Sequence, residues 1–450
     1  MSKQSIAFVI VVSLVSAFIV ANLAPAAFAD DWPMFQHDLS HTGYSTSAAP
    51  VTNQILWRFE ASDISTAPAS VANGIVYVGG STNMYAINTA NGIQLWNYSG
   101  EPVSGGFSIF APAVANGMVY VGNGDGSLYA FNALTGSLSW VYQTLSSGIG
   151  SPSVANGIVY IGSGDFNVYA LNATTGTVIW NYTTGNQVYS SPALVNGILY
   201  ISSYDGNVYA LNATDGKVIW KFLAYSLKGT EAIPSSPSVA DGIVYVGSPN
   251  DNVYALNASS GVKLWNYTTG GAVDDSPAVA NGVIYFGSGD DNVYALNAAT
   301  GALIWIYSTG APVGSDLAVS DGMVYVCSVS SAPFPYSGQF PSKGTLYDLN
   351  ATTGKNIWSF VNQESQLSFP VIAGGVLYIS ADGYLYAFGT QYTPSPSPSP
   401  TSTPSQSTSS SPSLAPSVPE FPWMLAILTL LIAVSIFVAV MASRQSSHKI

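Results

Sequence analysis

Two histidines near the N-terminus have a spacing that suits a metal site. His37 and His41 are four residues apart with Asp38 between them, and these residues could be metal ligands if the stretch were helical. Pro33 and Gly43 flank the pair, and no helical apolar stripe runs through the stretch. We therefore favour a structural N-terminal segment packed on the body of the protein, with metal binding as the alternative.

Other groups for acid–base or redox chemistry are scarce. The single cysteine, Cys327, excludes an internal disulfide and a cysteine-based metal site, and we expect it to be a small buried side chain in a strand. Only 7% of the residues are charged, and the formal net charge is −13. Such a surface repels phosphate backbones, so no nucleic-acid partner is expected. The composition favours a function without catalysis, and we predict no catalytic residue.

Aspartates form two groups with different expected roles. The first group lies in short hairpin turns, where turn chemistry is favoured over calcium binding. Its members are Asp125, Asp165, Asp205, Asp251, Asp290, Asp291 and Asp382. The second group precedes short inner strands and is predicted to face a central channel. We predict that Asp274, Asp275 and Asp316 contact a ligand, together with the loop aromatics Phe334 and Tyr336.

These side chains belong to an array of repeats that must position them. The pattern A-x-N-x-x-x-G-x-x-x-W recurs, as in Ala170, Asn172, Gly176 and Trp180, and a seventh copy has Asp348 in place of the alanine. Repetition at spacings of 39 to 53 residues indicates a repeat fold. Eight tryptophans define the outer strands of the units: Trp57, Trp96, Trp140, Trp180, Trp220, Trp265, Trp305 and Trp358.

The order of the strands predicts a closed ring. Each unit reads as four short strands separated by turns, whereas the strand of Trp57 comes first and the last unit ends without a tryptophan strand. Pairing the first strand with the last unit would remove both free ends of the array. We therefore predict an all-β, eight-bladed β-propeller over residues 54–392, closed by an N-terminal strand.

The additional residues of the longer units fall at one end of the blades. They lie in connections from the fourth strand of one blade to the first of the next, around 105–110 and 224–233, and in one connection between second and third strands, 329–344. In an antiparallel blade these connections share one end. Loops on a rigid scaffold are common binding sites, so we predict binding on this loop-rich face.

The two ends of the chain indicate export and anchoring. Residues 1–29 have the pattern of a signal peptide, with an uncleaved anchor as the alternative, and 30–53 form the N-terminal segment. A Pro/Ser/Thr-rich disordered stalk, 393–419, precedes an apolar transmembrane helix, 420–443, and a basic cytoplasmic tail, 444–450. The propeller is then outside the cell. Sequons on the outer strands predict glycosylation at Asn97, Asn181 and Asn266.

The repeats resemble those of PQQ-type, or quinoprotein-like, propellers, in which the tryptophan of one blade packs against the backbone of its neighbour. That family includes quinone-dependent alcohol dehydrogenases and a scaffold lipoprotein of a barrel-assembly machinery. Pro419-Glu420-Phe421-Pro422 and the following helix also resemble archaeal PEF-type sorting signals, which implies that a sortase-like enzyme could remove the helix.

The resemblance leaves three functions open. We favour a non-enzymatic cell-surface propeller that binds a protein, glycan or envelope polymer. The alternative is a membrane-tethered dehydrogenase that uses PQQ and calcium, although the adjacent cysteine pair of such enzymes is absent here. A third interpretation is a structural part of an envelope assembly.

Overall fold

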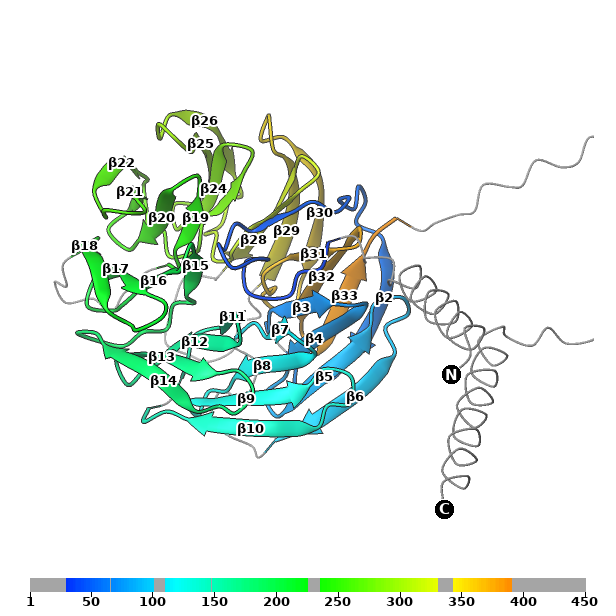
Figure 1. Cartoon of the computed structure of the whole chain (residues 1–450). Coiled ribbons are helices and arrows are strands. Elements are labelled where there is room, and N and C mark those ends of the chain that lie inside the picture. Colours follow the sequence, from blue (N-terminus) through cyan, green and yellow to red (C-terminus); the bar gives the residue numbers. More distant parts are fainter. Residues whose placement is uncertain are drawn as a thin grey trace, which may run out of the picture. The chain divides into compact units, whose positions relative to one another are not determined.

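The computed structural model describes residues 30–64, 66–100, 110–146, 148–225, 235–330 and 343–390. These residues form 33 strands and contain no helix. The strands make eight sheets arranged around a common centre (Figure 1), which confirms the all-β, eight-bladed propeller. No helix long and apolar enough to cross a membrane is found in these ranges. The predicted signal peptide, stalk, transmembrane helix and tail lie outside them.

The first four blades follow one another along the chain, with four antiparallel strands in each. The first two contain β3 (Ala69–Ala72), β4 (Ile75–Gly79), β5 (Asn83–Asn88) and β6 (Gln94–Ser99), then β7 (Ala113–Ala115), β8 (Met118–Gly122), β9 (Ser127–Asn132) and β10 (Leu138–Gln143). The next two contain β11 (Ser153–Ala155), β12 (Ile158–Gly162), β13 (Asn167–Asn172) and β14 (Val178–Thr183), then β15 (Ala193–Val195), β16 (Ile198–Ser202), β17 (Asn207–Asn212) and β18 (Val218–Leu223).

The remaining blades include the two irregular ones. The fifth and sixth contain β19 (Ser238–Ala240), β20 (Ile243–Ser248), β21 (Asn252–Asn257) and β22 (Lys263–Thr268), then β23 (Ala278–Ala280), β24 (Val283–Ser288), β25 (Asn292–Asn297) and β26 (Leu303–Ser308). The seventh contains β27 (Ala318–Ser320), β28 (Met323–Ser330), β29 (Lys343–Asn350) and β30 (Asn356–Asn362), with β1 (Tyr44–Ser45) added. The eighth contains β31 (Val371–Ala373), β32 (Val376–Ala381), β33 (Tyr384–Phe388) and β2 (Ile55–Glu60).

Strand β2 closes the ring. It pairs antiparallel with β33, so that Trp57 lies opposite Ala387, although the two strands are at opposite ends of the propeller sequence. The eighth blade thus takes its outer strand from the beginning of the repeats, as the sequence predicts. Closure leaves the array without a terminal blade whose face would be exposed.

Adjacent blades are joined by a repeated tryptophan contact. Trp180 donates a hydrogen bond from Nε1 to the carbonyl oxygen of Ala213 in the next blade, at 2.9 Å, and the same oxygen accepts a bond from the hydroxyl of Tyr160 at 3.2 Å. The indole lies over Gly216, where an added Cβ would be 2.6 Å from the ring. Glycine is required at this turn because its φ is +71° and because the ring leaves no room for a side chain.

The contact between the seventh and eighth blades is different. In the other blades the acceptor lies in the turn that joins the third strand to the outer strand. In the eighth blade no such turn exists, because the outer strand β2 and the third strand β33 come from opposite ends of the propeller sequence. Pro50 of the N-terminal segment supplies the carbonyl oxygen instead, at 3.4 Å from Trp358 Nε1 and 2.9 Å from the Tyr325 hydroxyl. The N-terminal segment therefore completes this interface.

A carboxyl group lies inside the same interface. Asp348 replaces the alanine of the repeat and pairs in register with Tyr325 and Trp358. Its side chain is fully buried, and neither carboxyl oxygen has a hydrogen-bond partner among the described residues. Burial raises the pKa of Asp348 from 3.8 to about 7, because no donor compensates the charge.

Replacing the docking glycine tests the tryptophan contact. Gly216→Ala and Gly197→Ala both place a Cβ at a positive φ, +71° and +76°, but only Gly216 faces an indole, whereas nothing lies within 4 Å at Gly197. We expect Gly216→Ala to lose roughly 1–3 kcal/mol more unfolding free energy than Gly197→Ala, through overpacking. Denaturant unfolding measures the difference, and equal losses would contradict the docking role.

Replacing Asp348 tests its pKa. The folded protein holds this proton more tightly than the unfolded chain, so stability is retained below the ordinary pKa of 3.8 and is lost as pH rises through about 7. Asp348→Ala restores the residue of the other repeats. We expect the unfolding free energy of Asp348→Ala, measured relative to that of the parent protein, to rise by about 3 kcal/mol between pH 4 and pH 8 in thermal or denaturant unfolding. Asp215→Ala, at an exposed turn, should not show this rise. A constant difference for Asp348→Ala would refute the raised pKa.

Candidate functional site at the channel mouth

The N-terminal segment lies along the inner strands of the ring. Its backbone carbonyls accept hydrogen bonds from the inner-strand amides of six blades, and β1 pairs parallel with β27. The bonds run from Val71 to Trp32, Val114 to Pro33, Leu194 to Leu39, Val239 to Ser40, Val279 to Thr42 and Val319 to Gly43, at 2.6 to 2.8 Å. These amides lie on the inner edge of each sheet, where only β1, on β27 of the seventh blade, adds a further strand. The segment therefore satisfies polar groups that would otherwise face the channel.

The two histidines of this segment have separate environments. His41 is fully buried, lies 3.3 Å from Ser153 Oγ through Nε2, and has its pKa lowered to about 4 by burial. His37 Nε2 lies 3.0 Å from Asp30 Oδ1. Burial opposes the charge of His37, but Asp38 and Asp30 together raise its pKa. In the described part of the chain, no three histidine, cysteine or acidic side chains are placed to hold a metal ion.

Two of the predicted ligand residues, Asp275 and Asp316, interact at the sixth and seventh blades. Asp316 is buried and accepts a hydrogen bond from the backbone N–H of Ser276 at 2.6 Å. Burial raises the pKa of Asp316 to about 6, and burial together with the neighbouring Asp316 and Asp274 raises that of the half-buried Asp275 well above its usual range. Two carboxyls that disfavour each other's charge retain a proton near neutral pH.

Asp316 also has a structural role that its sequence context did not indicate. In the third and fifth blades, the residue at its position is a serine whose Oγ accepts the amide of the preceding blade, as Ser151 does for Ala111 and Ser236 for Ser191, both at 2.9 Å. Asp316 makes the same inter-blade bond with a carboxylate oxygen. Gln36 of the N-terminal segment bonds to Asp316 and lies 3.4 Å from the carbonyl of Ser276, a contact across 240 residues that no motif signalled.

The predicted ligand set is only partly brought together. Asp274 is exposed beside Asp275, and both precede β23, while Asp316 precedes β27. Phe334 and Tyr336 lie outside the described residues. The exposed carboxyl of Asp274 is therefore the part of the set that is most accessible to a partner.

Four of the seven turn aspartates, Asp125, Asp165, Asp205 and Asp290, accept hydrogen bonds within the protein. Asp165 accepts bonds from the backbone N–H of Leu145 at 3.0 Å and from the hydroxyl of Tyr169 at 2.8 Å. Asp205 repeats this arrangement with Gly185 and Tyr209. Burial alone would raise the pKa of both carboxyls, but these hydrogen bonds outweigh it and hold each pKa below 3.8. Each of these two carboxylates thus links a hairpin turn to the preceding blade, which is a structural role.

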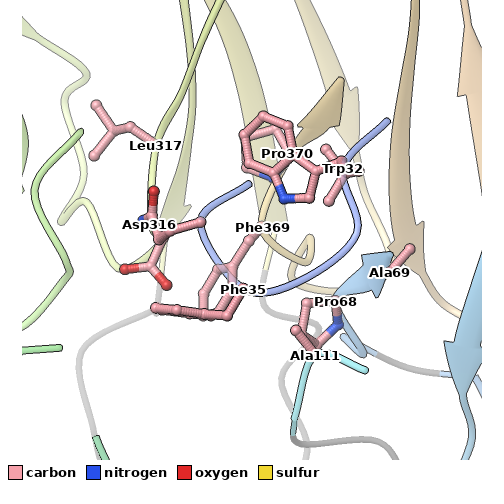
Figure 2. A pocket seen from close by; sticks show the side chains of 11 residues that line it. Trp32, Phe35, Pro68, Ala69, Ala111, Asp316, Leu317, Phe369 and Pro370 are labelled. Carbon is pink, nitrogen blue, oxygen red and sulfur yellow. The ribbon is translucent and has the colours of Figure 1, made fainter. Parts of the chain in front are cut away.

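A small cavity lies between the N-terminal segment and the inner strands at the loop-rich end of the blades. Figure 2 shows Trp32 and Phe35 of this segment beside Asp316, Phe369 and Pro370. The cavity that they line has a volume of about 20 Å³. That is room for about one water molecule, whereas sites for small ligands occupy about 300–1,000 Å³.

The described lining of this cavity does not fit PQQ with calcium. Its volume is too small for a tricyclic quinone, and its lining contains no lysine, arginine or histidine to pair with the carboxylates of PQQ. Calcium requires about six to eight converging oxygens, and the carboxylates of Asp165 and Asp205 are instead engaged by protein donors. Cys327 is buried, and burial raises the pKa of its thiol, so it supplies no reactive thiolate.

Known solved structures share the fold. BamB from Moraxella catarrhalis is 18% identical, with a TM-score of 0.60 over 75% of this chain and 98% of that chain. The quinohemoprotein alcohol dehydrogenase ADHIIG from Pseudomonas putida HK5 is 16% identical, with a TM-score of 0.65 over 88% of this chain and 83% of that chain. At such identities the likeness establishes the propeller fold alone.

Sequence comparison identifies the family. The quinohemoprotein alcohol dehydrogenase of Comamonas testosteroni is 34% identical over 149 residues, which are 30% of this chain and 21% of that protein, so the alignment spans about a fifth of its length. The family model described as outer membrane protein assembly factor BamB matches residues 45–149, 144–276 and 268–391. Because these matches extend across all eight blades, the chain belongs to this family of PQQ-type propeller repeats.

Proposed function

We propose that this chain is a non-enzymatic, membrane-anchored propeller that binds a protein, glycan or envelope polymer at the cell surface. The observation that carries the proposal is the occupied channel. The N-terminal segment lies along the inner strands, in the position in which a propeller could hold a ligand along its axis, and the cavity beside its Trp32 and Phe35 has a volume of only about 20 Å³. Binding is then a property of the outer surface of the ring.

The loop-rich face is the part of that surface which differs between blades. At the opposite face, each inner hairpin uses a two-residue turn, such as Asn156-Gly157, with both φ values positive. At the loop-rich face, the connections vary in length and carry Asp274, Asp275 and Asp316. Variation on a constant scaffold is the usual basis of specific recognition. An acidic face with an exposed carboxyl favours a partner that presents cations or hydrogen-bond donors.

Export and glycosylation complete the proposal. The signal peptide and C-terminal helix would place the propeller outside the membrane. Asn97, Asn181 and Asn266 each follow a docking tryptophan and are exposed on the outer strands β6, β14 and β22. Sugars at these positions would cover free strand edges and leave the loop-rich face accessible.

The second candidate is a PQQ-dependent dehydrogenase tethered to the membrane. It is favoured by the resemblance of 149 residues to a quinohemoprotein alcohol dehydrogenase. The size of the channel cavity and the engagement of the turn carboxylates weigh against it, because neither leaves described residues that suit the cofactor.

Photocrosslinking tests which face binds. A photoreactive amino acid at position 274 lies on the loop-rich face, and one at position 241 lies in an exposed inner-hairpin turn on the opposite face. In cells that express the full chain, we expect a specific cross-linked product from position 274 and none of the same mass from position 241. Products that are identical for both positions, or that arise only from 241, would refute the assignment.

Thermal unfolding with the cofactor tests the alternative. Ligand present at a hundred times its dissociation constant stabilises the folded state by about 2.7 kcal/mol. We expect the melting temperature of the full chain with PQQ and calcium to equal that with calcium alone. An increase that requires PQQ would establish a cofactor site and favour the dehydrogenase.

A further inference from the structure

The inner-hairpin tyrosines follow a rule with one exception. In seven blades, the tyrosine of the second strand donates its hydroxyl to a backbone carbonyl that docks the adjacent tryptophan. The pairs are Tyr77 with Ala133, Tyr120 with Ala173, Tyr160 with Ala213, Tyr200 with Ala258, Tyr245 with Ala298, Tyr285 with Ala351 and Tyr325 with Pro50, at 2.9 to 3.3 Å. The eighth tyrosine, Tyr378, has no such bond among the described residues.

Tyr378 is otherwise placed like the others. Its ring lies 5.8 Å from that of Trp57, and the indole still donates to the carbonyl of Thr89 in the first blade at 2.8 Å. The carbonyl that would accept the Tyr378 hydroxyl is thus present and is used by Trp57 alone. Tyr378 is only 1% exposed, but its hydroxyl is not among the buried atoms that lack a partner, so the small accessible part of the side chain includes the hydroxyl, which can meet solvent or a ligand.

A cavity of about 220 Å³ lies at this interface between the eighth and first blades. Its lining includes the turns that follow β31 and β5, at the end of the blades opposite the loop-rich face. Its walls are Asp31, Val71, Gly74, Thr89, Ala90, Ala373, Gly374, Val376 and Tyr378. The first of the two turn residues is glycine here, at Gly374, whereas the other seven blades have asparagine or aspartate.

Few polar side chains line this cavity. Asp31 uses Oδ2 to accept the backbone N–H of Asn73 at 3.0 Å, and Thr89 donates its hydroxyl to the carbonyl of Gly74 at 3.0 Å. The remaining side-chain groups that can bind a ligand are the second carboxylate oxygen of Asp31 and the hydroxyl of Tyr378. The lining contains no lysine, arginine or histidine to neutralise the carboxylate.

We propose that this cavity binds a primary alkylammonium group, with Asp31 and the hydroxyl of Tyr378 as acceptors and the aliphatic walls around the alkyl chain. An ammonium carries three donors and a compact positive charge, which suits two acceptors of which one is a carboxylate. Val71, Val376 and Ala90 offer apolar surface to a short chain. A sugar would leave most of its hydroxyls without protein partners, and an anion would be repelled by Asp31.

The ammonium group has two sources that share this chemistry. It belongs either to a free small amine or to a lysine side chain of a partner. The site is independent of the binding proposed for the loop-rich face, because it lies at the other end of the blades and uses none of the same residues.

Calorimetric titration of the purified full-length chain tests the site with n-butylammonium chloride, n-butanol and sodium butyrate. We expect saturable binding of n-butylammonium, and binding of the other two probes at least about tenfold weaker, because they lack the charge that pairs with Asp31. Asp31→Asn, which keeps an acceptor for Asn73, should weaken n-butylammonium binding about tenfold or more. Tyr378→Phe should weaken it about two- to tenfold.

Tyr245→Phe is the matched control, because its hydroxyl bonds to Ala298 at 3.0 Å and lies in another blade. It should bind n-butylammonium like the parent but melt at a lower temperature, whereas Tyr378→Phe should melt like the parent. No saturable binding, equal binding of n-butanol, or binding unchanged by Asp31→Asn overturns the proposal. The proposal is also overturned if Tyr378→Phe lowers the melting temperature as much as Tyr245→Phe does. A peptide with one lysine that binds more tightly than n-butylammonium would identify a protein as the source.

Discussion

The structure depends on the contact between an indole of one blade and the turn of the next. A single carbonyl oxygen accepts both the tryptophan N–H and a tyrosine hydroxyl, and a glycine beneath the ring lets the two backbones approach. Because the tryptophan lies on the outer strand and the tyrosine on the second strand, one turn is bonded to two strands of its neighbour. Repetition of this contact sets the distance between blades around the ring.

Closing the ring with a strand from the other end of the repeats makes two interfaces irregular. The eighth blade has no turn between β33 and β2 to provide the docking carbonyl and glycine, so the carbonyl of Pro50 takes this role. The carboxyl of Asp348, which has no hydrogen-bond partner among the described residues, is buried in the same interface. At the next interface the tryptophan contact is retained, but the Tyr378 hydroxyl has no hydrogen-bond partner in the described part of the chain, and a cavity lies beside it. Departures from the repeat therefore gather at the closure, where the local sequence cannot be periodic.

The N-terminal segment determines how the fold can be used. Inner strands of a propeller present unpaired amides toward the channel, and here one chain segment accepts six of them. The cost of leaving those groups unbonded accounts for the packing of a stretch that has no repeat signature. The same segment covers inner-strand positions that would otherwise face the channel.

The sequence by itself determined the propeller, the number of blades, the closing strand and the tryptophan positions, because these follow from periodicity and from turn residues that act locally. It also favoured turn chemistry for Asp165 and Asp205, since the turn motif is contiguous. Only the tertiary structure decided that Gln36 bonds to Asp316, that Pro50 docks Trp358, and that Tyr378 stays unpaired beside Asp31. The physical reason is sequence separation: partners such as Pro50 and Trp358 lie 308 residues apart, and their contact arises only when the ring closes.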